Sequence, residues 1–202
     1  MPRNPGSPPR RCVLPEPALL RPAVFLDRDG TISEEVGYLN DASQFRMFPF
    51  AIDAIRRLND AKLPVIVVTN QSGVGRGFFP ESMVHTVHEV MTRQLAAGGA
   101  HLNAIYYCPH TSDDECECRK PKPGLLERAA REHDIDLQRS FVVGDRYGDV
   151  ELAHGTDCRG ILVRTGYGEE DLRENRASWP RQPDFVADDL AAAVDWILRQ
   201  TK

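Results

Sequence analysis

The segment that decides the fold reads Phe25-Leu26-Asp27-Arg28-Asp29-Gly30-Thr31. It continues an apolar run that starts at Ala23, and a continuous apolar run is typical of a strand buried on both faces of a sheet. The two aspartates that follow place one carboxylate at the strand tip and the next just beyond it. Asp27 could attack phosphorus to form an acyl phosphate, and Asp29 could protonate the departing oxygen and then deprotonate water. The alternative for this string alone is an Asx turn that caps the strand.

Other apolar segments predict four more strands, over residues 65–68, 104–107, 141–143 and 161–163. Apolar side chains at helical spacing predict helices that begin after Pro49, after Pro80 and at Pro123–Gly124, and a last helix over about 188–198. The alternation predicts the α/β class, with a doubly wound, mostly parallel sheet. Only a loop and one helix fit between the first two strands, so we expect no large cap domain.

The composition is that of one globular domain, and we assign residues 23–200 to it. Residues 1–22 are rich in Pro and Arg and lack the apolar segment of a secretory signal, so we expect a disordered lead-in. No run approaches the roughly 18 apolar residues of a membrane-spanning helix. The net charge of −5 argues against nucleic acid or an anionic membrane as the main partner. We expect a cytoplasmic monomer.

Polar side chains follow the predicted strands at their carboxyl ends, where ligands bind in open α/β sheets. One strand runs into Thr69, after which small residues and glycines could cradle phosphate oxygens, although they also suit an ordinary turn. Another runs into Asp145. Crowded carboxylates are unfavourable without a cation, so we expect Mg²⁺ on Asp27, Asp145 and a backbone carbonyl of Asp29.

Two cations, Arg119 and Lys120, could contact phosphoryl oxygens. Taken alone, a lysine before Pro121 could equally be a solvated loop charge. The preceding loop, 108–118, contains three cysteines and one histidine.

That loop predicts a structural zinc site rather than a disulfide framework. Its candidate ligands are Cys108, His110, Cys116 and Cys118. Three thiolates and one imidazole form a closed tetrahedral set with no open position for substrate. The alternative is four unrelated residues. The other histidines, His88 among them, have no such constellation and are interpreted as surface or helix residues.

Together these motifs resemble the haloacid dehalogenase superfamily, in the branch of the heptose-bisphosphate and histidinol-phosphate phosphatases. The resemblance covers about residues 23–198. The four superfamily motifs occur in order, at Asp27 with Asp29, at Thr69, at Lys120, and at Asp145 with Asp149. It implies a magnesium-dependent phosphatase that acts through an aspartyl-phosphate on a small anionic phosphorylated substrate.

The resemblance also implies individual roles. Asp27 would be the nucleophile, Asp29 the general acid/base, and Thr69, Arg119 and Lys120 the groups that stabilise the transition state. Substrate contacts are expected from Glu35, Gly37, Tyr38, Asn70, Gln71, Ser72 and Arg146.

The substrate expected within this branch is a sugar bisphosphate, D-glycero-D-manno-heptose 1,7-bisphosphate, cleaved at position 7. Gly37-Tyr38 and Arg164-Thr165-Gly166 are similar to the heptose enzymes. Arg146 and the short spacing from His110 to Cys116 are instead similar to the histidinol-phosphate enzymes, which remain the alternative. An alternative of another class is a non-catalytic binding module on the same fold.

Overall fold

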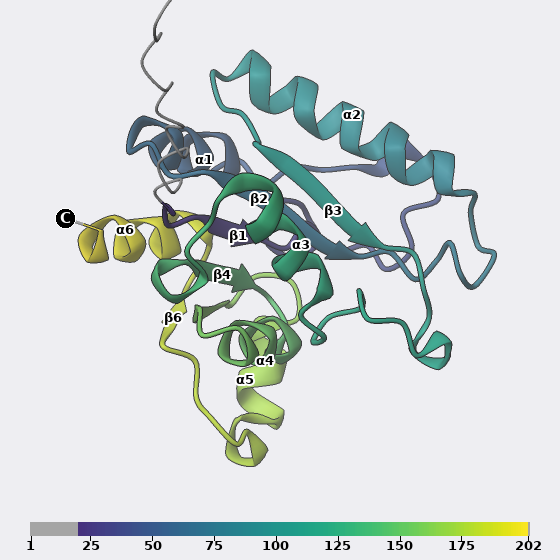
Figure 1. The fold of residues 1–202 in the computed structure, drawn as a ribbon. Coiled ribbons are helices and arrows are strands. Elements are labelled where there is room, and N and C mark those ends of the chain that lie inside the picture. Colours follow the sequence, from purple (N-terminus) through teal and green to yellow (C-terminus); the bar gives the residue numbers. More distant parts are fainter. Residues whose placement is uncertain (1–19, 202) are drawn as a thin grey trace, which may run out of the picture.

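The computed structural model describes residues 20–201 and contains one six-stranded sheet (Figure 1). Its strands are β1 (Val24–Leu26), β2 (Val65–Asn70), β3 (Ala104–Cys108), β4 (Phe141–Gly144), β5 (Arg159–Val163) and β6 (Phe185–Ala187). The strand order is β3-β2-β1-β4-β5-β6, and every neighbouring pair is parallel. The five predicted strands are therefore confirmed, and the sheet is wholly rather than mostly parallel.

Helices cover both faces of this sheet. They are α1 (Ala51–Asp60), α2 (Glu81–Ala97), α3 (Gly124–His133), α4 (Tyr147–Gly155), α5 (Gly168–Glu174) and α6 (Leu190–Gln200). Short 3₁₀ helices occupy Ala42–Gln44, Ser112–Asp114, Leu137–Arg139 and Arg176–Ser178. Within the described residues no helix is both long and apolar enough to cross a membrane.

Alternation along each strand divides the core into two layers, because successive strand side chains point to opposite faces. Val24 and Leu26 belong to the layer that packs against α1, α2 and α6. Phe25 belongs to the opposite layer, against α3 and α4, and Figure 1 shows these two helices on one side of the sheet. The fold is therefore doubly wound, as predicted.

The chain reverses its direction across the sheet at β1. It first runs outward through β2 to β3, then returns to the other side of β1 with β4 and continues to β5 and β6. A reversal of this kind leaves a crevice at the carboxyl ends of the central strands, and ligands bind there in open α/β sheets.

Three elements, α4, α5 and β6, were not predicted. Helix α4 buries Asp149 as well as Val150, Leu152 and Ala153, so it has no clean apolar stripe. Helix α5 is almost entirely polar, and β6 has only three residues. Tertiary packing decides such segments more than local pattern does.

The amino-terminal end of the described chain contacts the sheet domain. Residues 1–19 of the predicted lead-in lie outside the described residues. Arg21, however, bridges Ile135, and its backbone N–H donates to the carbonyl of Asp134. The described sheet domain therefore includes contacts made before residue 23.

Candidate active site and metal centres

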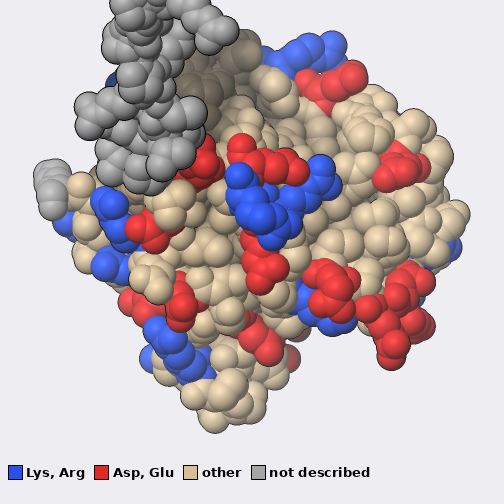
Figure 2. Space-filling view, viewed as in Figure 1, with Lys and Arg blue, Asp and Glu red and all other residues tan. Residues whose placement is uncertain are grey.

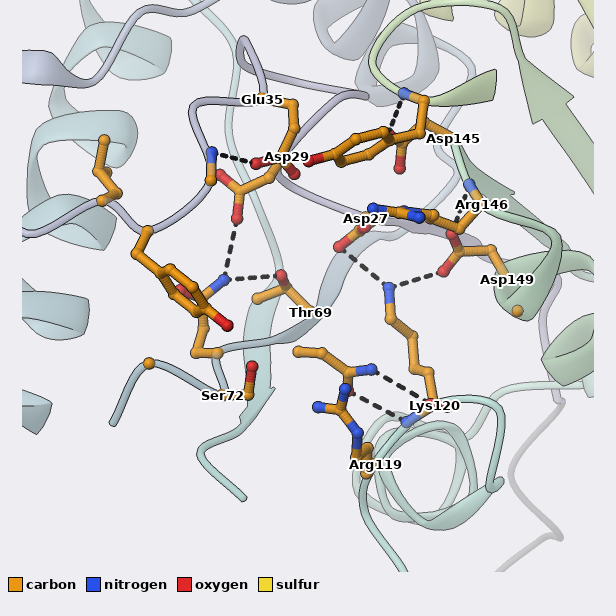
Figure 3. A pocket seen from close by; sticks show the side chains of 18 of the residues that line it. Asp27, Asp29, Glu35, Thr69, Ser72, Arg119, Lys120, Asp145, Arg146 and Asp149 are labelled. Carbon is orange, nitrogen blue, oxygen red and sulfur yellow. Dashed lines mark hydrogen bonds and ion pairs between the residues drawn. The ribbon is translucent and has the colours of Figure 1, made fainter. Parts of the chain in front are cut away.

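A hollow of about 550 Å³ lies at the carboxyl ends of β1, β2 and β4. Asp27 follows β1, Thr69 lies near the end of β2, and Asp145 follows β4. Figure 3 shows their side chains around one opening together with Lys120, which comes from the loop before α3. Residues from four distant parts of the sequence thus meet where the topology leaves a crevice.

Lys120 lies at the centre of this site, with a side chain only 6% exposed. Its Nζ is 3.0 Å from Asp27 Oδ1 and donates hydrogen bonds to Asp149 Oδ1 at 2.6 Å and to the Val68 carbonyl at 2.9 Å. Burial opposes the charge, but the carboxylates of Asp149 and Asp27 raise the pKa of Lys120 above its ordinary value. The lysine is a buried cation of the site and not the solvated loop charge that the sequence alone left open.

Three carboxylates face this lysine, because oxygens of Asp27, Asp145 and Asp149 lie within 4.8 Å of one another. Burial, together with the neighbouring acids and against the effect of Lys120, raises the pKa of Asp27 to about 6. Burial and the charges of Asp27 and Asp149 raise the pKa of Asp145 to about 8. Gly30 allows the Asp145 carboxylate to lie close to the backbone that follows Asp29. A Cβ at this position would lie 2.0 Å from Asp145 Oδ2, and the φ of Gly30 is +74°.

This donor set fits a divalent cation that prefers oxygen ligands, such as Mg²⁺. The sequence prediction named Asp27, Asp145 and Asp29 as its ligands. The Asp29 carboxylate lies outside the cluster, so of this residue only the backbone carbonyl remains a candidate. Asp149 is the acid that the predicted metal set omitted, although its place after β4 was visible in the sequence.

The Asp29 carboxylate is held by a different set of groups. Arg28 donates to both of its oxygens, and the Gln71 amide donates to Oδ2 at 3.0 Å. Behind them lies His88, which is only 7% exposed. His88 is a residue of helix α2, as predicted, but it is buried and does not lie on the surface. Its partner Arg28 is 60 residues away in sequence, so this contact leaves no local signal.

The residues expected to contact substrate all line the hollow. These are Glu35, Gly37, Tyr38, Asn70, Gln71, Ser72 and Arg146, together with Arg119. The Gly37 N–H donates to Glu35. Burial and the charge of Asp29 raise the pKa of Glu35 above its usual range. Sequence reasoning missed Tyr167, whose ring lies 3.5 Å from the Arg146 guanidinium and helps to orient that cation over the opening.

Charge on the surface is mixed. Figure 2 shows acidic and basic side chains interspersed over one face of the molecule. Attraction of an anion therefore depends on the local cations at the hollow, which are Arg119, Lys120 and Arg146.

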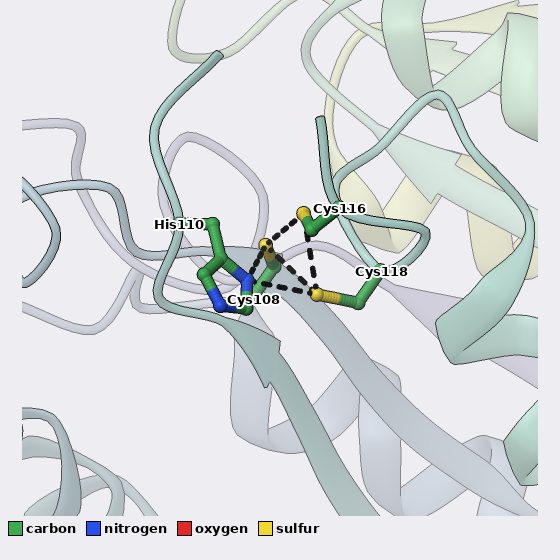
Figure 4. A group of neighbouring side chains, drawn as sticks. All are labelled: Cys108, His110, Cys116 and Cys118. Carbon is green, nitrogen blue, oxygen red and sulfur yellow. Dashed lines mark hydrogen bonds between the residues drawn. The ribbon is translucent and has the colours of Figure 1, made fainter. Parts of the chain in front are cut away.

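The predicted zinc ligands also converge, as Figure 4 shows. The sulfurs of Cys108, Cys116 and Cys118 are 3.2–3.6 Å apart, and His110 Nδ1 is 3.2 Å from Cys118 Sγ. These separations are too long for a disulfide. Sulfurs about 2.3 Å from one tetrahedral zinc would lie roughly 3.8 Å apart. The four donors therefore fit a closed zinc site.

The cysteine loop is connected to the hollow by hydrogen bonds. Arg119 Nη1 donates to the His110 carbonyl at 3.2 Å. On the other side, the Gln71 N–H donates to the Cys108 carbonyl at 2.7 Å, and the Gly75 N–H donates to the Pro109 carbonyl at 2.9 Å. The loop thus contacts the segment that follows β2 and also Arg119, both of which border the hollow.

A doubly wound parallel sheet that gathers aspartates, a threonine and a lysine at one edge is the arrangement of a haloacid dehalogenase-like hydrolase. The HAD-hydrolase-like family matches residues 117–193. The D-glycero-D-manno-heptose-1,7-bisphosphate 7-phosphatase of Thermosynechococcus vestitus is 44% identical, over 88% of this chain and 95% of the relative. The corresponding β-heptose enzyme of Escherichia coli K12 is 40% identical, over 90% and 96%.

A solved structure agrees with these relatives. It is the D,D-heptose 1,7-bisphosphate phosphatase from B. bronchiseptica complexed with magnesium and phosphate. Its TM-score is 0.82 at 35% identity, and the match covers 89% of this chain and 99% of that one. The chain belongs to the family of the D-glycero-D-manno-heptose-1,7-bisphosphate 7-phosphatases, within the haloacid dehalogenase-like hydrolases.

Proposed function

We propose that this chain is a phosphatase that removes the 7-phosphate of D-glycero-D-manno-heptose 1,7-bisphosphate. The observation that carries the proposal is the environment of Asp27. Its carboxylate lies at the tip of β1, 3.0 Å from Lys120 Nζ, and lines the hollow. The relatives named above act on this sugar bisphosphate, and the match covers most of both chains.

Asp27 is the nucleophile in this proposal, and its attack on phosphorus gives an aspartyl-phosphate and a free sugar hydroxyl. Lys120 offsets negative charge on Asp27 and on the transferred phosphoryl group. Thr69 and Arg119 border the same space and would hold phosphoryl oxygens. Asp149 keeps Lys120 in place through the 2.6 Å hydrogen bond that it accepts.

Asp29 is the proposed general acid/base. It gives a proton to the leaving sugar oxygen and then takes one from the water that hydrolyses the aspartyl-phosphate. Asp27, Asp145 and the Asp29 backbone carbonyl would hold Mg²⁺, which supplies charge stabilisation for the phosphoryl oxygens. Support for this ion comes from the crowded carboxylates and from the magnesium in the related B. bronchiseptica structure.

The second phosphate of the substrate would bind at the rim of the hollow. Arg146 lies there against Tyr167, on a different element from Lys120. An open hollow bordered by loops rather than by a cap domain suits a bulky phosphosugar.

We further infer that Cys108, His110, Cys116 and Cys118 hold a structural zinc ion, because three thiols and one imidazole converge without a disulfide. Free thiols of this kind favour a reducing compartment, so the cytoplasm is the proposed location. A monomer remains the predicted oligomeric state.

The test is a phosphate-release assay with magnesium that compares the two anomers of the heptose 1,7-bisphosphate with histidinol phosphate. We expect the heptose substrates to be preferred, and ³¹P NMR to show a heptose 1-phosphate as product. The Asp27→Asn variant is the control for contaminating phosphatases. Equal or faster turnover of histidinol phosphate would contradict the proposed substrate. No phosphate release from any of the three compounds would contradict the proposed reaction.

A further inference from the structure

Arg28 stands between the two aspartates of the first motif, and its side chain is only 2% exposed. A buried guanidinium is costly unless it is paired and hydrogen-bonded. Its Nε donates to Asp29 Oδ1 at 2.9 Å, and its Nη2 donates to Asp29 Oδ2 at 2.6 Å. This bidentate fork fixes both the position and the plane of the Asp29 carboxylate.

Two further residues complete the network around Arg28. Gln71 accepts from Arg28 Nη2 through Oε1 at 2.9 Å and donates from Nε2 to Asp29 and to Thr69, each at 3.0 Å. Because a guanidinium only donates and a carboxylate only accepts, this amide has one consistent orientation.

His88 closes the network, with its Nε2 3.3 Å from Arg28 Nη1. Nε2 of the ring must be the acceptor, because a guanidinium has only N–H donors and no acceptor atom. Burial and the nearby Arg28 charge lower the pKa of His88 to about 3, so the ring is neutral at working pH.

We propose that Arg28 is a positioning residue that holds the Asp29 carboxylate at the angle required for proton transfer to the leaving group and from water. The inference rests on the proposed function, in which Asp29 is the acid/base. An ionised carboxylate has about four acceptor sites. Arg28 and Gln71 donate to three of them, two on Oδ2 and one on Oδ1, and the Ser33 hydroxyl makes a long contact of 3.5 Å to Oδ1. Oδ1 is therefore the less firmly bonded oxygen, and the fork leaves it a defined direction toward the substrate.

The guanidinium is not needed to form the turn in which it lies. The N–H groups of Ile32 and Ser33 donate to the Arg28 backbone carbonyl, and the Gly30 N–H donates to the Ser33 carbonyl. These bonds use the backbone alone. The side chain therefore acts mainly on Asp29, and we expect its loss to affect catalysis more than the local fold.

The experiment measures kcat and KM for phosphate release from the heptose 1,7-bisphosphate in Arg28→Gln, Arg28→Lys, Asp29→Asn and the Arg28→Gln/Asp29→Asn double variant. Arg128→Gln is the matched control, because it removes an arginine–carboxylate pair with Glu132 on the surface. Thermal melts of every protein accompany the kinetics. Lysine keeps the charge of Arg28 but cannot form the fork.

We expect Arg28→Gln to lower kcat about 10- to 100-fold, with KM within about threefold of the parent, since a misplaced positioning group costs roughly 100-fold. Arg28→Lys should lose less. The double variant should be no slower than Asp29→Asn within about threefold, because the two residues act as one unit.

Three results would overturn the inference: an Arg28→Gln kcat within threefold of the parent, losses that multiply in the double variant, or a rise in KM alone. If neither Arg28 variant melts cooperatively, Arg28 serves the fold and the inference is again wrong. A parent-like Asp29→Asn would instead refute the acid/base role in the proposed function, and the inference would fall with it. An impaired Asp29→Asn beside an unimpaired Arg28→Gln refutes only the inference.

Discussion

The cysteine loop makes a prediction about catalysis as well as about stability. Arg119 follows Cys118 directly, and its guanidinium donates to the His110 carbonyl at 3.2 Å. Lys120 is held differently, because its backbone N–H donates to Asn70 Oδ1 and its carbonyl accepts from Asn70 Nδ2. Removing one of the proposed zinc ligands by Cys118→Ser should therefore displace Arg119 much more than Lys120.

The size of the effect follows from the contact that is lost. A hydrogen bond to a charged group contributes about 1.5–3 kcal/mol. If Arg119 makes one such contact to the transferred phosphoryl group, its displacement should lower kcat/KM by roughly 10- to 150-fold. The core layer against α1, α2 and α6 contains no residue of the loop, whereas Cys108, Cys116 and Cys118 belong to or pack against the opposite layer. We therefore expect a large loss in rate with a modest fall in melting temperature.

The assay is a double-mutant cycle on phosphate release with Cys118→Ser, Arg119→Ala and their combination, and a parallel cycle with Lys120→Ala. Cys158→Ser is the matched control, because Cys158 is buried outside the cluster of Cys108, His110, Cys116 and Cys118. Zinc content and thermal melts are measured for each protein. We expect strong non-additivity with Arg119→Ala and nearly independent losses with Lys120→Ala.

Independent losses in the Arg119 cycle would refute this reasoning, because they would mean that the loop does not orient the guanidinium. Outright unfolding of Cys118→Ser would also refute it, and zinc would then be needed for the fold itself. A Cys158→Ser variant with the same rate loss would point to a general effect of serine substitution.

Three further predictions concern the site and its supports. Asp27→Asn should abolish nearly all phosphate release while the melting temperature and zinc content stay unchanged, and activity within tenfold of the parent would exclude the covalent mechanism. The pKa of His88 is lowered to about 3 in the folded chain. Below about pH 6.5 the unfolded chain therefore binds a proton that the folded chain does not bind. The free energy of unfolding, measured in urea, should therefore decrease as the pH is lowered from about 6.5 to about 3, by up to about 1.4 kcal/mol per pH unit. His88→Gln should flatten this slope, and an unchanged slope would contradict the burial of a neutral ring. Gly144→Ala should lower both stability, by about 1–3 kcal/mol, and kcat, because its Cβ would lie 2.1 Å from Asp149 Oδ2. Gly155→Ala, whose Cβ meets nothing within 4 Å, is the control in the same melts and assays, and equal behaviour of the two variants would show that Asp149 is not displaced.

The sequence by itself determined five of the six described strands and the kinds of polar residue at their ends. Each strand is a short apolar run, and each polar residue follows its run at once, so the pattern is local and can be read without knowing the partners. The same is true of the cysteine loop, because its four donors lie within eleven residues, 108–118. Parallel pairing then requires the strand ends to meet at one edge.

Only the tertiary structure decided how the side chains pair at that edge. Lys120 lies between Asp27 and Asp149, which are far from it in sequence. The Asp29 carboxylate lies outside the cluster of Asp27, Asp145 and Asp149 and pairs with Arg28. Burial makes an unpaired charge costly, so each charged group takes the partner that the packing brings within reach. The partners of Lys120 come from distant elements, and Arg28, although adjacent to Asp29, takes its orientation from Gln71 and His88 on other elements. A residue pattern along the chain does not show which distant residues meet in space.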